Sequence, residues 1–131
     1  MRPIYLALTT ALALTPLGAQ QQAAPVDGAQ VFGMVCAMCH SVQPPAKAAP
    51  PMSHVTAYYL RKHGDTTAAA TAIVAYLKKP EAARSLMPPM AIERFGLMPA
   101  QAHLSDAQLN AVARYVLTLA DTAHGHGRMR H

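Results

Sequence analysis

The chain has 131 residues, a net charge of +5, no tryptophan and two cysteines. This length suits one small domain, and the two cysteines are the only ones in the chain. The Lys and Arg residues are scattered and form no basic stripe interleaved with aromatic side chains, so the sequence argues against nucleic-acid binding.

The N-terminus has the pattern of an export signal. Arg2 is followed by residues 4–17, an uncharged and largely apolar stretch that matches a signal-peptide core and is short for a membrane span. We expect a signal peptide over residues 1–19, with alternative cut sites at 20–24, and an uncleaved anchor as the competing interpretation. No second apolar stretch of spanning length follows, so the mature chain is predicted to be exported, to the periplasm or beyond, without a membrane span.

A first helix is predicted after a short polar leader at residues 20–26, which we expect to be disordered. Asp27 is a suitable N-cap, because its carboxylate can accept hydrogen bonds from the free N–H groups of a first turn. The helix would begin at Gly28, include Phe32 and lead directly into the next motif.

The most informative motif is Cys36-Ala37-Met38-Cys39-His40. Two thiols on one helical turn can add to the two vinyl groups of haem, and the histidine that follows can then ligate the iron. This is the pattern of a c-type haem attachment site. Its single copy predicts one covalently bound haem c.

Three other interpretations of the motif are weaker. A redox dithiol of the thioredoxin kind needs a βαβ context, which this chain lacks, and a zinc site needs further ligands at finger-like spacing. A structural disulfide or a pair of buried thiols is the third alternative. Haem also suits the composition, because aromatic residues make up only 5% of the chain and a buried porphyrin would supply the missing apolar bulk.

Two helices are predicted in the middle of the chain. Ser53 is a candidate cap for a helix that ends near Gly64, and residues 67–79 have a helical pattern that Pro80 ends. The candidate buried residues of the second helix are Ala69, Ile73, Val74, Tyr76 and Leu77. Three tyrosines are candidates for haem contact, although ordinary packing is the commoner role: Tyr58, Tyr59 and Tyr76.

Methionine is concentrated between residues 87 and 99. A thioether is a soft ligand, and methionine opposite histidine raises the potential of haem iron. Met87 and Met98 each precede a proline, and Met90 is a third candidate ligand. The competing interpretation is that all three methionines fill gaps in the core.

The residues from Ser105 to Gln108 form a capping-box pattern that opens a final helix. We expect this helix to end near residues 120–122. Its predicted buried stripe consists of Leu109, Val112, Ala113, Val116 and Leu119.

The domain is therefore predicted to cover residues 27–122, followed by a flexible tail at 123–131. A surface metal site on His124 and His126 is the less favoured interpretation of that tail.

From about residue 27 to residue 120 the chain resembles the class I c-type cytochromes. The resemblance rests on the Cys36–His40 motif, the Met-Pro pairs and the C-terminal helix. It implies an all-α cytochrome c fold, in which the N- and C-terminal helices cross and further helices and loops surround one haem. Four residues match places where the family packs its first helix against its last: Gly28, Phe32, Val112 and Tyr115.

The resemblance also implies a pair of axial ligands. His40 would be the proximal ligand, and the family usually places its distal methionine a few residues before the start of the last helix. Met98 lies six residues before Leu104 and is favoured on that spacing, with Met90 or Met87 as alternatives.

The proline-dense loop at residues 41–51 corresponds to a family segment whose proline carbonyl accepts a hydrogen bond from the proximal histidine. Pro50 matches by position and Pro51 is a close rival, whereas Ala49 stands where the family usually has glycine. Such a bond would fix the tautomer and the orientation of the His40 ring.

The predicted function is that of an exported, soluble monohaem electron carrier, not an enzyme, whose iron cycles between ferric and ferrous states. Its partners would be redox proteins, and the basic charge suits an acidic docking patch on them. Two alternatives stay open: a haem subunit of a periplasmic oxidoreductase complex, and an open-site haem enzyme or gas sensor. The second requires that none of the three candidate methionines binds iron.

Overall fold

In the computed structural model, which describes residues 24–120, Asp27 caps the first helix as predicted. Its carboxylate accepts hydrogen bonds from the N–H groups of Ala29 (2.8 Å) and Gln30 (3.5 Å). Helix α1 spans Gly28–Val31 and continues as a wider π-helical turn, η1, over Phe32–Cys36.

The predicted signal peptide at 1–19, most of the leader at 20–26 and the tail with His124 and His126 lie outside the described residues.

Helix α2 spans Met52–His63, and the prediction that Ser53 caps it is wrong. The helix begins at Met52, two residues before the start that a cap at Ser53 would give, and the Ser53 hydroxyl is buried without a hydrogen-bond partner. The preceding loop supplies the acceptors instead, because the N–H groups of Met52 and Ser53 donate to the carbonyls of Ser41 (2.8 Å) and Val42 (3.0 Å). The predicted end is correct: Gly64 closes the helix at φ +76°, which a residue with a side chain rarely adopts.

Helix α3 spans Thr66–Lys78, within one residue of the prediction at each end. The Asp65 carboxylate accepts a hydrogen bond from Ala68 N–H (2.8 Å), and Pro80 follows the last turn. Of the five predicted apolar residues, three are buried and two half-buried: Ala69, Ile73 and Leu77, then Val74 and Tyr76.

Two short elements were not predicted, one before the methionine-rich stretch and one within it. A 3₁₀ turn, η2, spans Ala82–Arg84, and helix α4 spans Pro89–Phe95. A proline fits the first turn of α4, where its missing N–H has no intrahelical partner to lose. Gly96 ends the helix at φ +74°.

The last helix, α5, spans Asp106–Thr118, and its predicted capping box is confirmed. The Ser105 hydroxyl accepts a bond from Gln108 N–H (3.3 Å), and the Gln108 side chain accepts one from Ser105 N–H (2.9 Å). The helix ends slightly before the predicted boundary. All five residues of its predicted stripe are buried: Leu109, Val112, Ala113, Val116 and Leu119.

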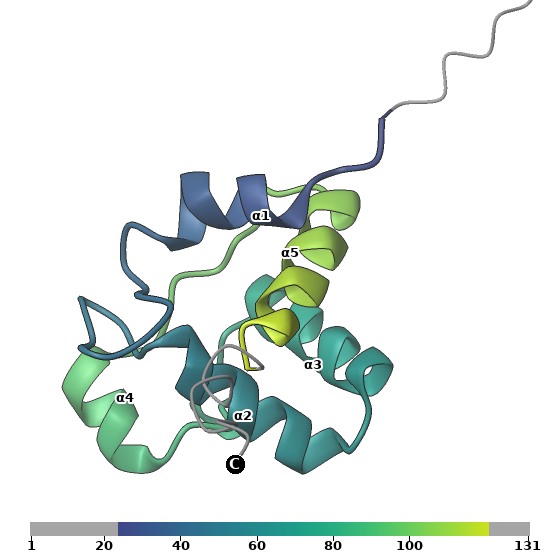
Figure 1. The fold of residues 1–131 in the computed structure, drawn as a ribbon. Coiled ribbons are helices and arrows are strands. Elements are labelled where there is room, and N and C mark those ends of the chain that lie inside the picture. The colour runs from purple at the N-terminus through teal and green to yellow at the C-terminus, as the bar shows by residue number, and fades with distance from the viewer. Residues whose placement is uncertain (1–23, 121–131) are drawn as a thin grey trace, which may run out of the picture.

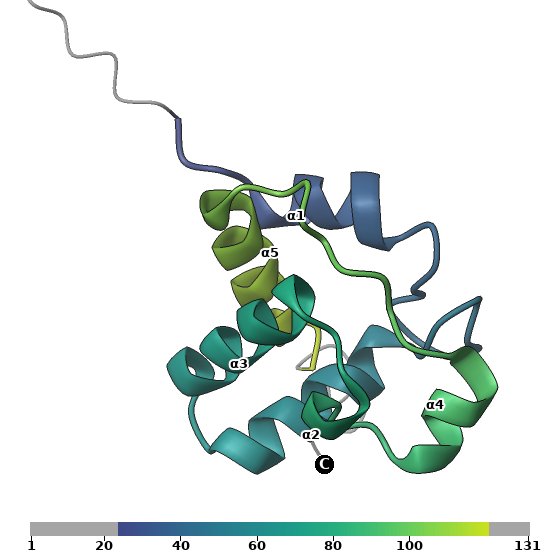
Figure 2. The same ribbon diagram turned by 180° about the vertical axis from the view of Figure 1, so that it is seen from behind.

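Helix α5 is the centre of the packing, with α1 crossing one end and α3 lying along its side (Figures 1 and 2). Helix α2 packs on α3 and is tied to α5 by a buried bond from the Thr56 hydroxyl to the Val116 carbonyl (2.8 Å). Helix α4 stands at the edge, away from α5 (Figure 1). None of the helices within residues 24–120 is both long and apolar enough to cross a membrane.

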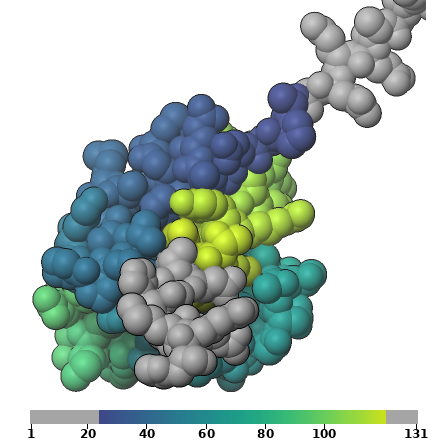
Figure 3. Space-filling model, viewed as in Figure 1, coloured from purple at the N-terminus to yellow at the C-terminus, as the bar shows by residue number. Residues whose placement is uncertain are grey.

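The predicted crossing of α1 over α5 depends on Gly28. A Cβ atom at this position would meet the Ala111 carbonyl group and would lie 2.8 Å from Tyr115 Cβ. One turn later, the rings of Phe32 and Tyr115 pack at 5.6 Å between centroids, tilted by 52°. Figure 3 shows the first helix lying directly beside α5. The all-α fold is thus held together by contact between the two ends of the domain.

Gly28→Ala is expected to lower the free energy of unfolding by about 1–3 kcal/mol, because the added methyl group forces two backbones apart. Gly33→Ala is the matched control, since a Cβ there meets nothing within 4 Å. That variant should be neutral or slightly stabilising, as alanine restricts the unfolded chain. Chemical denaturation of both variants tests this, and equal effects would contradict the close-crossing account.

Candidate functional site

The Cys36–His40 motif forms a tight turn at the end of η1. The N–H groups of Cys39 and His40 both donate to the Cys36 carbonyl, at 3.1 and 2.9 Å. Both thiols are free; Cys36 is buried and Cys39 is exposed. Burial, and to a lesser extent the neighbouring Cys39, raises the pKa of the Cys36 thiol. The turn therefore presents two unpaired thiols and an imidazole on one short segment.

The His40 ring is held in one tautomer. Its Nδ1 atom lies 2.7 Å from the Pro50 carbonyl oxygen, and only 7% of the residue is exposed. A carbonyl can only accept, so Nδ1 carries a proton, and in the neutral ring Nε2 then keeps its lone pair. Burial lowers the pKa of His40, an effect that the Pro50 bond partly offsets. The acceptor is Pro50 and not its rival Pro51, and the lowered pKa favours the neutral ring, whose free Nε2 could bind a metal.

The thiols and His40 border a cavity of about 370 Å³. Its walls come from η1, the loop at residues 39–50, α2, α3, residues 85–101 and α5. Most of the lining is aliphatic or aromatic, including Ile73, Leu77, Ile92, Phe95, Val112 and Val116. An apolar cavity bordered by two free thiols and an unprotonated imidazole nitrogen fits a covalently held haem. In the part of the chain that the structure describes, no cluster of three or more His, Cys, Asp or Glu side chains is placed to hold a metal ion.

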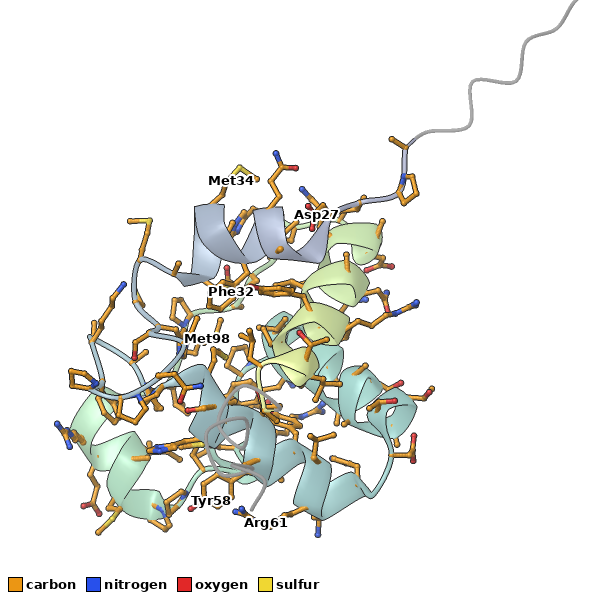
Figure 4. All side chains as sticks on the ribbon, in the orientation of Figure 1. Asp27, Phe32, Met34, Tyr58, Arg61 and Met98 are labelled. Atoms are coloured by element: carbon orange, nitrogen blue, oxygen red, sulfur yellow. The ribbon has the colours of Figure 1, made fainter. Side chains whose placement is uncertain are left out.

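The three candidate methionines do not share one environment. Met87 and Met98 both line the cavity that contains His40, whereas Met90 is 71% exposed and does not line it. Met87 and Met98 are both half-buried, and Met98 also packs against the buried core (Figure 4). Of the three candidate ligands, only Met87 and Met98 therefore have a thioether in the cavity wall.

Only two of the three candidate tyrosines lie at the cavity. Tyr59 and Tyr76 line the cavity, and burial followed by the neighbouring Tyr76 raises the pKa of Tyr59 to about 12. The Tyr58 ring lies instead under the Arg61 guanidinium, 4.5 Å from the ring centroid to Cζ, and does not line the cavity (Figure 4).

Sequence reasoning missed part of the cavity wall. The apolar residues of α4, Ala91, Ile92 and Phe95, face the cavity, but a seven-residue helix gives too short a period to recognise. Gln101 was also missed: it is buried and lines the cavity, although glutamine is usually exposed. The only feature of the sequence that could have indicated Gln101 is its position as a polar residue three places after Met98.

The comparison with protein families gives one match. The model of the family described as Cytochrome c matches residues 25–120. Searches of the curated proteins and of the solved structures gave no match. Proteins of this family bind haem c covalently and usually carry electrons. Because this family model matches residues 25–120, which is most of the chain, the chain belongs to the cytochrome c family.

Proposed function

We propose that this protein is an exported monohaem cytochrome that carries single electrons, with thioether bonds at Cys36 and Cys39 and with His40 and Met98 as axial ligands. The observation that carries the proposal is the shared cavity, since His40 and Met98 both line it together with the two thiols. Haem, when bound, supplies an iron that accepts and releases one electron. With both His40 and Met98 bound, the iron would have no coordination position free for a substrate.

Each residue has a distinct role in this proposal. The Pro50 carbonyl orients the His40 ring through the 2.7 Å bond to Nδ1 and keeps Nε2 available. The Met98 thioether favours the ferrous state more than water or a nitrogen ligand would. The apolar wall excludes water and so limits the polar reorganisation that accompanies a change of charge.

Met98 is preferred to Met87 for two reasons. It has the family's spacing before the last helix, and it packs against the buried core as well as lining the cavity. The exposed position of Met90 argues against that residue as a ligand.

Export and partner choice rest on the sequence and on surface charge. The apolar stretch at 4–17 supports export, which suits covalent haem attachment outside the bacterial cytoplasm. Among residues 24–120, three basic side chains form exposed ion pairs at 2.7–2.9 Å: Lys78 with Asp106, and Lys79 and Arg84 with Glu81. The pairs with Lys79 and Arg84 lower the pKa of Glu81. The basic excess of the whole chain favours an acidic surface on the redox partner.

Protein matured in a haem-attaching periplasm should carry the mass of one haem, and the haem should survive extraction with acidified acetone. The ferric protein should show the weak far-red absorption band of methionine-ligated haem, and carbon monoxide should bind the ferrous form slowly. Mass spectrometry and absorption spectroscopy measure these properties. Haem that moves into the organic phase would contradict covalent attachment, and rapid binding of carbon monoxide would favour the open-site enzyme or gas sensor.

A further inference from the structure

Gln101 is a buried amide in the wall of an otherwise apolar cavity. Only 7% of the residue is exposed, and it lines the cavity together with Met98, three residues earlier in the chain. Burial of an amide costs free energy unless its polar atoms are hydrogen-bonded. The hydrogen bonds of Gln101 therefore indicate what the residue does.

These bonds connect three parts of the fold. The side-chain Nε2 donates to the Pro99 carbonyl (2.8 Å), and the main-chain N–H donates to the Leu77 carbonyl (2.8 Å) near the end of α3. The Gln101 carbonyl accepts a bond from Leu104 N–H (3.1 Å), just before α5. One residue thus attaches the segment after Met98 to the end of α3 and to the start of α5.

The chain on the other side of Met98 is held less firmly. Helix α4 makes no substantial contact with the other described helices, and its apolar residues face the cavity. Gly96, two residues before Met98, has a positive φ of 74° and no side chain that could anchor it. The protein contacts that fix the backbone of Met98 are therefore concentrated downstream, at Gln101.

We infer that Gln101 is a positioning residue for the distal ligand, and this inference rests on the proposed ligation by Met98. The amide fixes the Pro99 carbonyl, which belongs to the first residue after Met98. With that peptide fixed, the thioether samples fewer positions and returns quickly after it leaves the iron. Without the amide, the ligand should leave more often while the rest of the fold is unchanged.

The test uses the haem-loaded protein with Gln101→Leu, which removes the side-chain donor and keeps the main-chain bonds. Leucine is chosen because methionine would add a thioether that could itself bind iron. In the variant, the far-red band should be lost at a lower temperature than the one at which circular dichroism shows the helices unfolding. In the wild type, the two temperatures should be closer together. Carbon monoxide should bind the ferrous variant about fivefold faster, as expected for the loss of one typical hydrogen bond.

Thr56→Val is the matched control, because it removes another buried side-chain bond, from the Thr56 hydroxyl to the Val116 carbonyl, that lies outside the Met98 segment. This variant should unfold at a lower temperature than the wild type. Its far-red band should be lost at the temperature where its helices unfold, and carbon monoxide should bind it at the wild-type rate. Gln101→Glu, which keeps the size of the side chain, provides a second variant if Gln101→Leu fails to fold.

The outcomes separate the two claims. If the Gln101 variants behave like Thr56→Val, the residue is merely structural and the inference is overturned. If the wild type and Met98→Ala both lack the band, Met98 is not the ligand, which overturns the proposed ligation and the role of Gln101 with it. A band that fades early only in the Gln101 variants supports both.

Discussion

Met98→Ala is expected to abolish the far-red band, lower the reduction potential and allow carbon monoxide to bind rapidly. The thioether stabilises the ferrous state, so its loss should lower the potential by a substantial part of the ~0.8 V range that axial ligands span in haem proteins. Potentiometric titration and stopped-flow mixing with carbon monoxide measure the two effects. The variant should still carry covalent haem, because Cys36, Cys39 and His40 are unchanged.

The other two candidate methionines serve as controls. Met90 is 71% exposed, so Met90→Ala should keep the band and change the free energy of unfolding by less than about 0.5 kcal/mol. Met87 lines the cavity but is only half-buried, so Met87→Ala should keep the band and lose part of the ~2–5 kcal/mol that a fully buried methionine contributes. If Met87→Ala loses the band and Met98→Ala retains it, the ligand has been assigned to the wrong residue.

The helices of the fold could be predicted where their signals are local. Asp27 and the Ser105–Gln108 box are capping patterns complete within four residues, and Gly64 supplies the positive φ that ends α2. The stripe on α5 could be predicted because a thirteen-residue helix repeats its apolar period several times. The crossing of α1 over α5 was expected from the family resemblance, and the space around Gly28 gives its physical reason.

The failures occurred where distant contacts decide the structure. Ser53 has the composition of a cap, but the loop carbonyls of Ser41 and Val42 meet the first N–H groups of α2 instead. Helix α4 begins at the second of two consecutive prolines and has one apolar face, which is turned toward the cavity rather than toward another helix.

The candidate site divides in the same way. Cys36, Cys39 and His40 are adjacent in the sequence, so spacing alone identifies them. The contact between His40 and Pro50 needed the resemblance, and the choice of Pro50 over Pro51 needed the 2.7 Å distance. The exposure of Met90 and the burial of Gln101 follow from how residues 85–101 fold over the cavity, which no local pattern encodes.

The cavity also predicts how the protein behaves without its cofactor. Mature chain made in the cytoplasm, where no haem is attached, should lack a well-packed structure. Without the cofactor, the apolar side chains that line the cavity of about 370 Å³ lose their packing partner and face water or empty space, which lowers the stability of the fold. The walls must therefore either collapse into the space or loosen, and few large side chains are available to fill it.

The haem-free chain should lose structure in some regions more than in others. Helix α4 has its apolar residues against the cavity and little contact with other helices, so its amides should exchange with solvent almost freely in the haem-free chain. The α1–α5 crossing, held by Gly28, Phe32 and Tyr115, should keep the most protection. Hydrogen exchange with mass spectrometry on the haem-loaded and haem-free chains compares these regions, and near-ultraviolet circular dichroism reports the packing of the tyrosines. A haem-free chain that unfolds cooperatively, with α4 as protected as in the haem-loaded protein, would mean that the helices alone support the fold.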